Sequence, residues 1–197
     1  MDTLFFSILS YLVGSIPTGL VIGKVFYNKD IREYGSKNSG GTNARRVLGP
    51  IPGFLVEVID VLKVFIPTFI AASSKHVGIN MAAFVGVAGV LGHCFSIFIK
   101  FKGGKGVASF FGMVAALNLW IGAIIIILWK IMKHALNYVS LASIISCFLA
   151  AFAFLFYYGF KPAFMVLLIG AIIVTYRHKN NIKRLLNGTE NKVNPSR

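Results

Sequence analysis

Long apolar runs separated by short basic segments constrain the fold of this chain more than any other feature of its sequence. Hydrophobic residues make up 56% of the 197 residues, and the mean hydropathy is +0.76. Several of the runs approach the roughly 20 residues that an α-helix needs to cross a lipid bilayer. We therefore expect an all-α polytopic membrane protein in which residues 1–197 form a single membrane-embedded domain.

The positions of the basic residues predict how the helices are oriented. The net charge is +14, but Lys and Arg gather between the apolar runs, as they do in the cytoplasmic loops of membrane proteins. This pattern explains the charge, so we expect no nucleic-acid partner. Lys24 and Lys29 follow the first apolar run, which places the end of that run in the cytoplasm and the N-terminus outside.

Five of the apolar runs are assigned directly as helices. They cover residues 3–25, 54–72, 81–99, 136–156 and 163–176. Within the first run, Pro17 has no backbone N–H to donate, so we expect a kink there.

Residues 107–128 decide the topology. If they form one span, the basic residues at 130–134 and the basic tail after residue 176 both fall outside the cell, against the charge rule. Two short helices, residues 106–116 and 118–131, return both clusters to the cytoplasm. We therefore predict seven transmembrane helices, two of them short, with the C-terminus in the cytoplasm. The short pair requires a thinned bilayer, a half-buried hairpin or a cover of protein.

A glycine-rich basic loop, residues 101–107, lies between two apolar runs. Gly103, Gly104 and Gly106 free the backbone for tight or left-handed turns, and their exposed N–H groups can form a concavity that binds anions. Lys105 adds a charge that suits phosphate. We expect a phosphorylated ligand here, at the boundary between water and lipid; the alternative is that the lysines of this loop only set the topology.

Residues 28–52 are interpreted as a polar loop. Small hydroxyl and amide side chains alternate there with glycines, and Arg45 and Arg46 follow. A phosphate monoester needs several donors and a bidentate clamp, and this segment can supply both. The fixed spacing of a Walker loop is absent. A flexible linker of the same composition is the alternative.

Two further groups of polar residues are notable. Glu57, Asp60 and Lys63 recur every three residues and share one helix face. Ionisable groups in an apolar span indicate a functional site, but we favour a structural pair between Asp60 and Lys63.

In the basic tail, which suits a short interfacial helix, His178 and Asn181 are three residues apart and can point together into a site.

Together, these segments resemble the bacterial acyl-phosphate-dependent glycerol-3-phosphate acyltransferase family over nearly the whole chain. The residues that carry the resemblance are Gly35, Ser36, Asn38, Gly40, Thr42, Asn43 and residues 46–49; Gly92, His93 and residues 101–108; residues 138–143; and Arg177, His178, Asn181, Ile182, residues 184–186 and Gly188. The chain departs from the family pattern at Lys37, where glycine is usual, at Gly41, where alanine is usual, and at Ser96, where proline is usual. We expect Ser96 to loosen the turn that follows His93.

The resemblance implies transfer of a fatty acyl chain from acyl phosphate to the sn-1 hydroxyl of glycerol 3-phosphate, which yields lysophosphatidic acid and phosphate. It also implies a multi-pass protein of the bacterial cytoplasmic (inner) membrane whose active site faces the cytoplasm. Acyl phosphate is an activated mixed anhydride, so positioning and charge stabilisation suffice without an enzyme nucleophile. We expect no cofactor, no metal and no obligate protein partner besides the two substrates and membrane lipid.

By the same resemblance, catalytic roles fall on Ser36, Arg46, Lys105 and His178. His178 is the candidate to orient or deprotonate the attacking hydroxyl; alternatively, a substrate phosphate takes the proton and His178 only binds. Substrate and phosphate binding is expected of Gly35, Asn38, Gly40, Thr42, Asn43, His93, Gly103, Gly104, Lys105, Gly106, Ser143 and Asn181.

A membrane transporter or channel for an organic phosphate is the alternative function. Transporters usually hold their substrate near the bilayer midplane between broken helices, often in repeated halves. In this chain the polar segments gather at one predicted membrane face and no internal repeat is evident. This pattern favours the enzyme.

Overall fold

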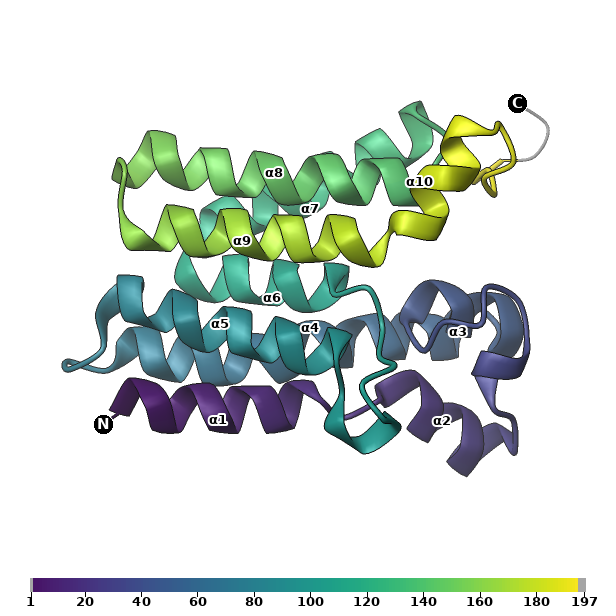
Figure 1. Cartoon of the computed structure of the whole chain (residues 1–197), viewed down its shortest axis with the longest axis horizontal. Coiled ribbons are helices and arrows are strands. Elements are labelled where there is room, and N and C mark those ends of the chain that lie inside the picture. The colour runs from purple at the N-terminus through teal and green to yellow at the C-terminus, as the bar shows by residue number, and fades with distance from the viewer. Residues whose placement is uncertain (1, 195–197) are drawn as a thin grey trace.

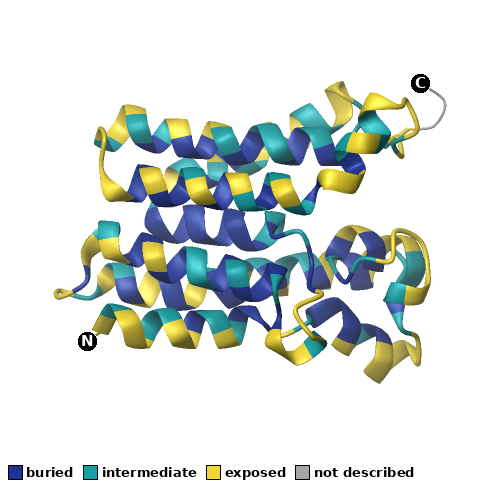
Figure 2. Cartoon of the chain, viewed as in Figure 1, coloured by how far each residue is buried: buried dark blue, intermediate teal, exposed yellow. Residues whose placement is uncertain are grey.

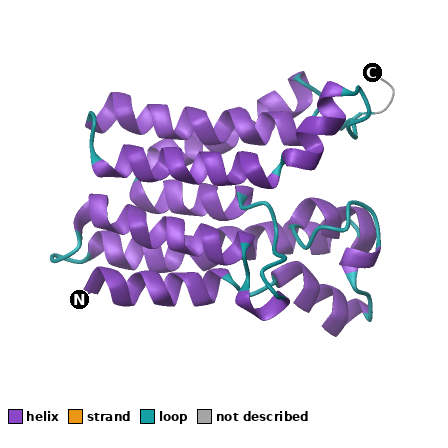
Figure 3. Ribbon diagram, viewed as in Figure 1, coloured by secondary structure: helices purple, strands orange, loops and turns teal. Residues whose placement is uncertain are grey.

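The computed structural model describes residues 2–194, and every regular element in that range is a helix (Figures 1 and 3). The α-helices are α1 (Asp2–Gly14), α2 (Thr18–Tyr27), α3 (Gly41–Leu48), α4 (Pro50–Ser73), α5 (Gly78–Cys94), α6 (Val107–Leu117), α7 (Leu119–Ala135), α8 (Val139–Tyr158), α9 (Pro162–Arg177) and α10 (Lys179–Leu186). Two short 3₁₀ turns, η1 (Ile31–Glu33) and η2 (Ile97–Ile99), complete the set. The all-α prediction is confirmed for the described residues.

The long helices lie side by side with their axes roughly aligned (Figure 1). The helix α1 packs on α5, α4 packs on both α5 and α6, and α8 packs on α9. The N-terminus lies at one end of this bundle. The short helices α2, α3 and α10 and the C-terminal segment lie at the other end (Figure 1), so the polar segments of the sequence share one end.

The helix α6 is the centre of the bundle. Every residue from Ser109 to Leu117 is buried (Figure 2), because α4, α5, α7, α8 and α9 all contact it. Its 11 residues span about 16 Å, roughly half the hydrocarbon core. The protein itself therefore covers this short helix, which is one of the three solutions that the sequence allows.

Asn118 separates α6 from α7, so the predicted division of this apolar stretch into two helices is confirmed. Its side chain accepts a hydrogen bond from the Ile121 N–H (3.0 Å) and donates one to the Tyr158 hydroxyl (2.9 Å). The first bond caps α7, and the second ties the turn to α8.

The predicted kink at Pro17 is a complete break between α1 and α2. At this break, the Ile16 carbonyl accepts a hydrogen bond from Lys63 Nζ (2.8 Å), and the Ser15 carbonyl accepts one from the Ser96 hydroxyl. Ser96 therefore ties the turn after α5 to the first helix. The expectation that it loosens this turn is wrong.

The interpretation of residues 28–52 as a loop is wrong for part of the segment, because α3 and the start of α4 lie within it. The helix α3 contains Gly41 and Asn43, which are weak helix formers. It is stabilised by packing: Ala44 lies in a small buried cluster with Ile31 of η1 and Val56 of α4.

The outer surface of the bundle suits a membrane. By length and composition, three helical segments of the described residues could cross a bilayer: Asp2–Tyr27, Gly78–Ile99 and Val139–Tyr158. The pair α9 and α10, bent by 62°, forms a fourth if it counts as one span. The outward-facing positions carry large exposed apolar side chains (Figure 2), among them Phe5, Ile66, Trp120 and Ile169.

Candidate active site

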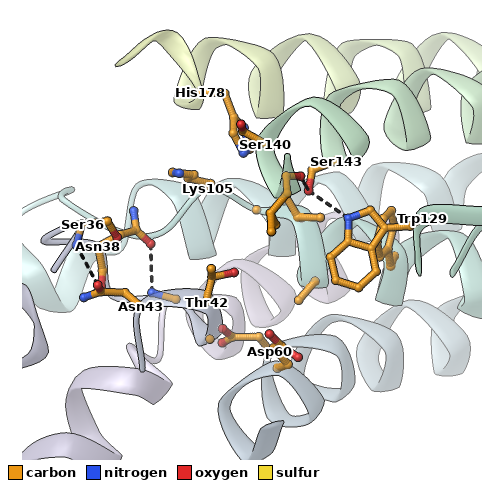
Figure 4. A pocket seen from close by; sticks show the side chains of 18 of the residues that line it. Ser36, Asn38, Thr42, Asn43, Asp60, Lys105, Trp129, Ser140, Ser143 and His178 are labelled. Atoms are coloured by element: carbon orange, nitrogen blue, oxygen red, sulfur yellow. Dashed lines mark hydrogen bonds between the residues drawn. The ribbon is translucent and has the colours of Figure 1, made fainter. Parts of the chain in front are cut away.

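A cavity of about 280 Å³ lies near the end of the bundle that holds α3 and α10. Its polar lining consists of Ser36, Asn38, Thr42, Asn43, Arg46, Glu57, Asp60, His93, Lys105, Lys130, Ser140, Ser143, His178, Asn181, Arg184, Glu190 and Asn191. Figure 4 shows that these side chains come from segments far apart in the sequence, including the loop before α3, the central glycine-rich loop, α8 and the start of α10.

Four helices begin at this cavity. Gly41 of α3, Val107 of α6, Ser140 of α8 and Asn181 of α10 lie in the first turns of these helices and line the cavity. At none of these four described N-termini does the N-cap side chain bond a backbone N–H group. Because helix N-termini carry partial positive charge, their convergence favours an anion.

Basic side chains add to this positive field. Arg46, Lys105 and Arg184 line the cavity. Burial lowers the pKa of the Lys105 ammonium to about 8; nearby Glu190 opposes this shift, whereas Arg184, Arg46 and Arg177 add to it. Lys105 therefore lies among cations, and a bound anion would stabilise its charged form.

The loop before α3 is shaped by the Asn43 side chain. Its amide nitrogen lies 2.7–3.2 Å from the carbonyl oxygens of Ile31, Tyr34 and Asn38, which share its two N–H donors, and its amide oxygen accepts the Ser36 N–H at 2.8 Å. Gly35 has a φ of +57°, and a Cβ there would lie 2.5 Å from that same oxygen. Gly35 does not line the cavity. These two residues hold the loop that presents Ser36 and Asn38 to the cavity, next to Thr42 at the start of α3.

The central glycines act differently from the expectation. The N–H groups of Gly103 and Gly104 donate to the Cys94 and His93 carbonyls at 3.2 and 3.0 Å, so they do not form an open concavity for an anion. A Cβ on either glycine would lie 2.1 Å from an atom of His93. Both glycines are needed for close approach to the end of α5, and neither lines the cavity.

Gly106 fits the sequence prediction more closely. Its φ is +86°, it is the N-cap of α6, and it lines the cavity. Lys37, at a position where the family usually has glycine, also lies in the left-handed region with a φ of +57°, so its backbone conformation is one that glycine adopts more readily.

His178 lies between α9 and α10 and is buried. Its Nδ1 lies 2.8 Å from the Val174 carbonyl. A carbonyl only accepts, so the proton of the neutral ring is on Nδ1 and the Nε2 lone pair is free. His178 and Lys105 both belong to the cavity lining (Figure 4).

Glu190 connects three polar residues around the cavity. Its carboxylate accepts from Asn181 Nδ2 (2.6 Å), the Ser140 hydroxyl (2.8 Å) and Arg184 Nε (2.7 Å). Glu190 was not predicted from the sequence as a site residue. Glu190 is an isolated acidic residue in the basic tail that follows residue 176, and this contrast in charge could have marked it as a site residue.

A buried ionic network supports the floor of the cavity. Asp60 Oδ1 lies 2.8 Å from Lys63 Nζ, accepts from the Thr18 hydroxyl at 2.9 Å and lies 3.6 Å from His93 Nδ1. The predicted structural pair between Asp60 and Lys63 is confirmed. Because Asp60 also lines the cavity, it joins the broken first helix to the site.

The cavity also has an apolar part, formed by α4, α6 and α7. Its lining residues include Phe54, Val58 and Val61 of α4, Phe111 of α6, and Ile126 and Trp129 of α7. One continuous cavity therefore combines an anion-attracting region with an apolar slot.

Most of the predicted site residues meet at this cavity. Those in its lining are Ser36, Asn38, Gly40, Thr42, Asn43, Arg46, His93, Lys105, Gly106, Ser143, His178 and Asn181. Six further polar or aromatic residues of the lining were not predicted as site residues from the sequence: Trp129, Lys130, Ser140, Arg184, Glu190 and Asn191.

Comparison with known proteins gives consistent matches along the chain. Residues 4–188 match the family model described as glycerol-3-phosphate acyltransferase. The glycerol-3-phosphate acyltransferase of Fusobacterium nucleatum is 46% identical over 187 residues, which cover 95% of this chain and 96% of that protein. The protein of the same name from Aquifex aeolicus is 44% identical over 203 residues, and the match covers 98% of this chain and 100% of that protein.

Solved structures agree with the sequence relatives. A crystal structure of PlsY (YgiH), an integral membrane glycerol 3-phosphate acyltransferase in its glycerol 3-phosphate form, matches with a TM-score of 0.91 at 41% identity and covers 98% of this chain and 96% of that chain. The lysophosphatidic acid form matches with a TM-score of 0.89 at 39% identity and the same coverage. This chain therefore belongs to the glycerol-3-phosphate acyltransferase family and is an integral membrane protein of the PlsY type.

Proposed function

We propose that this chain transfers a fatty acyl group from acyl phosphate to the sn-1 hydroxyl of glycerol 3-phosphate, with lysophosphatidic acid and phosphate as products. The observation that carries this proposal is the single cavity in which four helix N-termini meet an apolar slot. The charged region suits the phosphates of both substrates, and the slot suits the acyl chain. Family membership favours this activity over a transporter or channel.

The proposed reaction is a direct transfer. The sn-1 hydroxyl oxygen attacks the acyl carbonyl carbon, and the bond between that carbon and the phosphate oxygen breaks. The hydroxyl proton passes to His178 Nε2, which is unprotonated when Nδ1 donates to the Val174 carbonyl, or to a phosphate oxygen of a substrate. No cysteine is among the described lining residues, and an activated mixed anhydride does not require an enzyme nucleophile.

The site residues take two kinds of role in this proposal. Ser36, Arg46, Lys105 and His178 act on the reacting groups, because they line the charged part of the cavity. Those that bind substrate phosphate with side chains or helix-end N–H groups are Asn38, Gly40, Thr42, Gly106 and Asn181. Those that shape the site are Gly35, Asn43, His93, Gly103 and Gly104.

We further propose seven transmembrane segments: the broken helix α1–α2, then α4, α5, α6, α7, α8 and α9. The N-terminus lies outside and the C-terminus in the cytoplasm. Lys24 and Lys133 lie in the last turns of α2 and α7, and Lys102 and Arg184 follow α5 and α9. This topology places all four inside, in line with the positive-inside rule. The active site then faces the cytoplasm from the bacterial cytoplasmic (inner) membrane. Acyl phosphate, glycerol 3-phosphate and membrane lipid are its partners, with no obligate protein partner.

The test uses the purified full chain in detergent with palmitoyl phosphate and glycerol 3-phosphate, and it measures phosphate and lysophosphatidic acid. Palmitoyl-CoA serves as the control donor. Lys105→Ala and His178→Ala are expected to lower turnover at least 100-fold, in the range attributed to lost charge stabilisation and acid–base catalysis. The matched controls are Lys102→Ala and His76→Ala, because both side chains are exposed and outside the cavity.

Two results would overturn the proposal. The first is an absence of lysophosphatidic acid from folded protein supplied with acyl phosphate. The second is equal turnover with palmitoyl-CoA, which would refute the assignment of the donor but not that of the acceptor.

A further inference from the structure

Trp129 lies where the charged and apolar parts of the cavity meet. On α7, the residues Ile126, Trp129, Lys130 and Lys133 fall at i, i+3, i+4 and i+7 and share one face. The first three of them line the cavity. This face of α7 is therefore a wall of the slot, and Trp129 is its largest side chain.

The indole N–H of Trp129 is bonded to Ser143. Trp129 Nε1 donates to the Ser143 hydroxyl oxygen at 3.0 Å (Figure 4). That hydroxyl donates its own proton to the Val139 carbonyl at 2.7 Å. Ser143 has one proton to give, so in this arrangement it does not donate to a phosphate. Its role is to hold the indole, which differs from the phosphate-binding role expected from the sequence.

The indole ring is held on two other sides as well. Phe111 of α6 meets it edge-on, with ring centroids 5.9 Å apart and planes at 68°. The Lys133 ammonium lies 5.0 Å from the ring centroid. Each of these contacts favours one ring orientation. Trp129 therefore presents a rigid surface to the slot rather than a side chain that moves aside.

The position of this surface relates it to the acyl chain. Ser140, Ser143, Lys105 and His178 line the charged region, and the proposed reaction places the acyl carbonyl there. The indole is one hydrogen bond from Ser143. The carbons that follow the carbonyl therefore pass the ring as they enter the apolar slot.

We propose that Trp129 is a specificity-determining residue for the acyl donor: its fixed ring admits a straight chain and rejects a chain that is branched close to the carbonyl. This inference rests on the proposed function. A rigid apolar wall discriminates between substrates that differ by one methyl group by roughly 10- to 200-fold. Ser143 acts through Trp129 and is a positioning residue in this scheme.

The experiment compares palmitoyl phosphate with 3-methylhexadecanoyl phosphate, with glycerol 3-phosphate as the acceptor. The readout is the ratio of the two kcat/KM values, straight over branched. Trp129→Leu opens the wall, and we expect it to lower this ratio at least tenfold. Ser143→Ala keeps the indole but removes the hydrogen bond that holds it, so we expect a smaller decrease in the ratio of the two kcat/KM values.

Trp120→Leu is the matched control. Trp120 lies on the same helix but is 79% exposed and outside the cavity, so the ratio should stay at its original value. Ile126→Ala opens the same wall without changing the indole, and it tests the proposal independently of how well Trp129→Leu folds.

The ratio distinguishes specificity from a merely structural role. If Trp129→Leu and Ile126→Ala lower kcat/KM equally for both donors, the ring contacts no chain and the inference is wrong. A failure of the proposed function looks different, because the unmodified protein would then turn over neither donor.

Discussion

Arg177 joins the two loops that carry Lys105 and His178. Its Nη2 donates to the Gly103 carbonyl at 2.7 Å, and its Nε donates to the Gly104 carbonyl at 3.0 Å. The guanidinium also lies 5.3 Å from the centroid of the Phe95 ring. Because Lys105 follows Gly104 and His178 follows Arg177, this one side chain sets the distance between both proposed catalytic groups.

The expected loss of activity in Arg177→Met follows from the two hydrogen bonds that this variant removes. A hydrogen bond to a charged group contributes about 1.5–3 kcal/mol, so Arg177→Met removes at least ~3 kcal/mol from the contact between the end of α9 and the glycine-rich loop. At about 1.4 kcal/mol per factor of ten, we expect kcat/KM for palmitoyl phosphate to fall about 100-fold. Arg177→Lys can reach one carbonyl but not both, and a decrease of about tenfold is expected.

Initial-rate kinetics with purified protein measure this effect, and Lys179→Met is the matched control. Lys179 is two residues away, and its ammonium lies 5.0 Å from the Tyr176 ring centroid, so its loss removes the same charge without touching the glycine loop. We expect less than a threefold change.

The pH profile separates positioning from general destabilisation. Arg177 contributes to the low pKa of Lys105, so Arg177→Met should move the alkaline limb of the profile to higher pH. Equal losses in Arg177→Met and Lys179→Met, with no movement of this limb, would refute the reasoning.

Three further predictions concern charge, burial and backbone. Burial lowers the pKa of Lys105 to about 8, and the protonated form binds phosphate, so the KM for glycerol 3-phosphate should rise as the pH rises above 8. Lys105→Arg should move this rise in KM to higher pH, and a constant KM up to pH ~9.5 would contradict the prediction. Asp60→Asn leaves Lys63 buried without the carboxylate that lies 2.8 Å away, which should destabilise the protein by about 3–5 kcal/mol in thermal unfolding; adding Lys63→Met should restore most of this loss. Gly35→Ala should lower activity at least tenfold because its Cβ would lie 2.5 Å from an amide oxygen of the loop, whereas Gly159→Ala, also at positive φ but with nothing within 4 Å, should cost only about 1–2 kcal/mol of stability.

Hydropathy and charge predicted most of the helices. Apolar run length indicates a helix wherever lipid is the surrounding solvent, and Pro17 marked the break in the first of them. The division at Asn118 followed from the positions of basic residues far from it. The helix α3 was missed because Gly41 and Asn43 have low helix propensity, and its stability comes from contacts of Ala44 that only the folded chain contains.

The candidate site could be predicted at the level of residue types. The segments around Ser36, Lys105 and His178 carry groups that suit phosphate, and they meet at one cavity. The partners of each group could not be predicted. The N–H groups of Gly103 and Gly104 donate to carbonyls at the end of α5, which precedes them in the chain. Trp129 lies in an apolar run and carries no signal that distinguishes a cavity wall from a lipid-facing residue.

Four helix N-termini around the cavity have no side-chain cap, which lowers the stability of the helices that begin there. An N-cap side chain stabilises a helix by a few tenths of a kcal/mol to about 2 kcal/mol, and α3, α6, α8 and α10 lack this bond. On the proposed function, the phosphate group of a substrate takes the place of these caps and is shared between helices. On the proposed function, binding of glycerol 3-phosphate or inorganic phosphate should therefore raise the thermal stability of the protein.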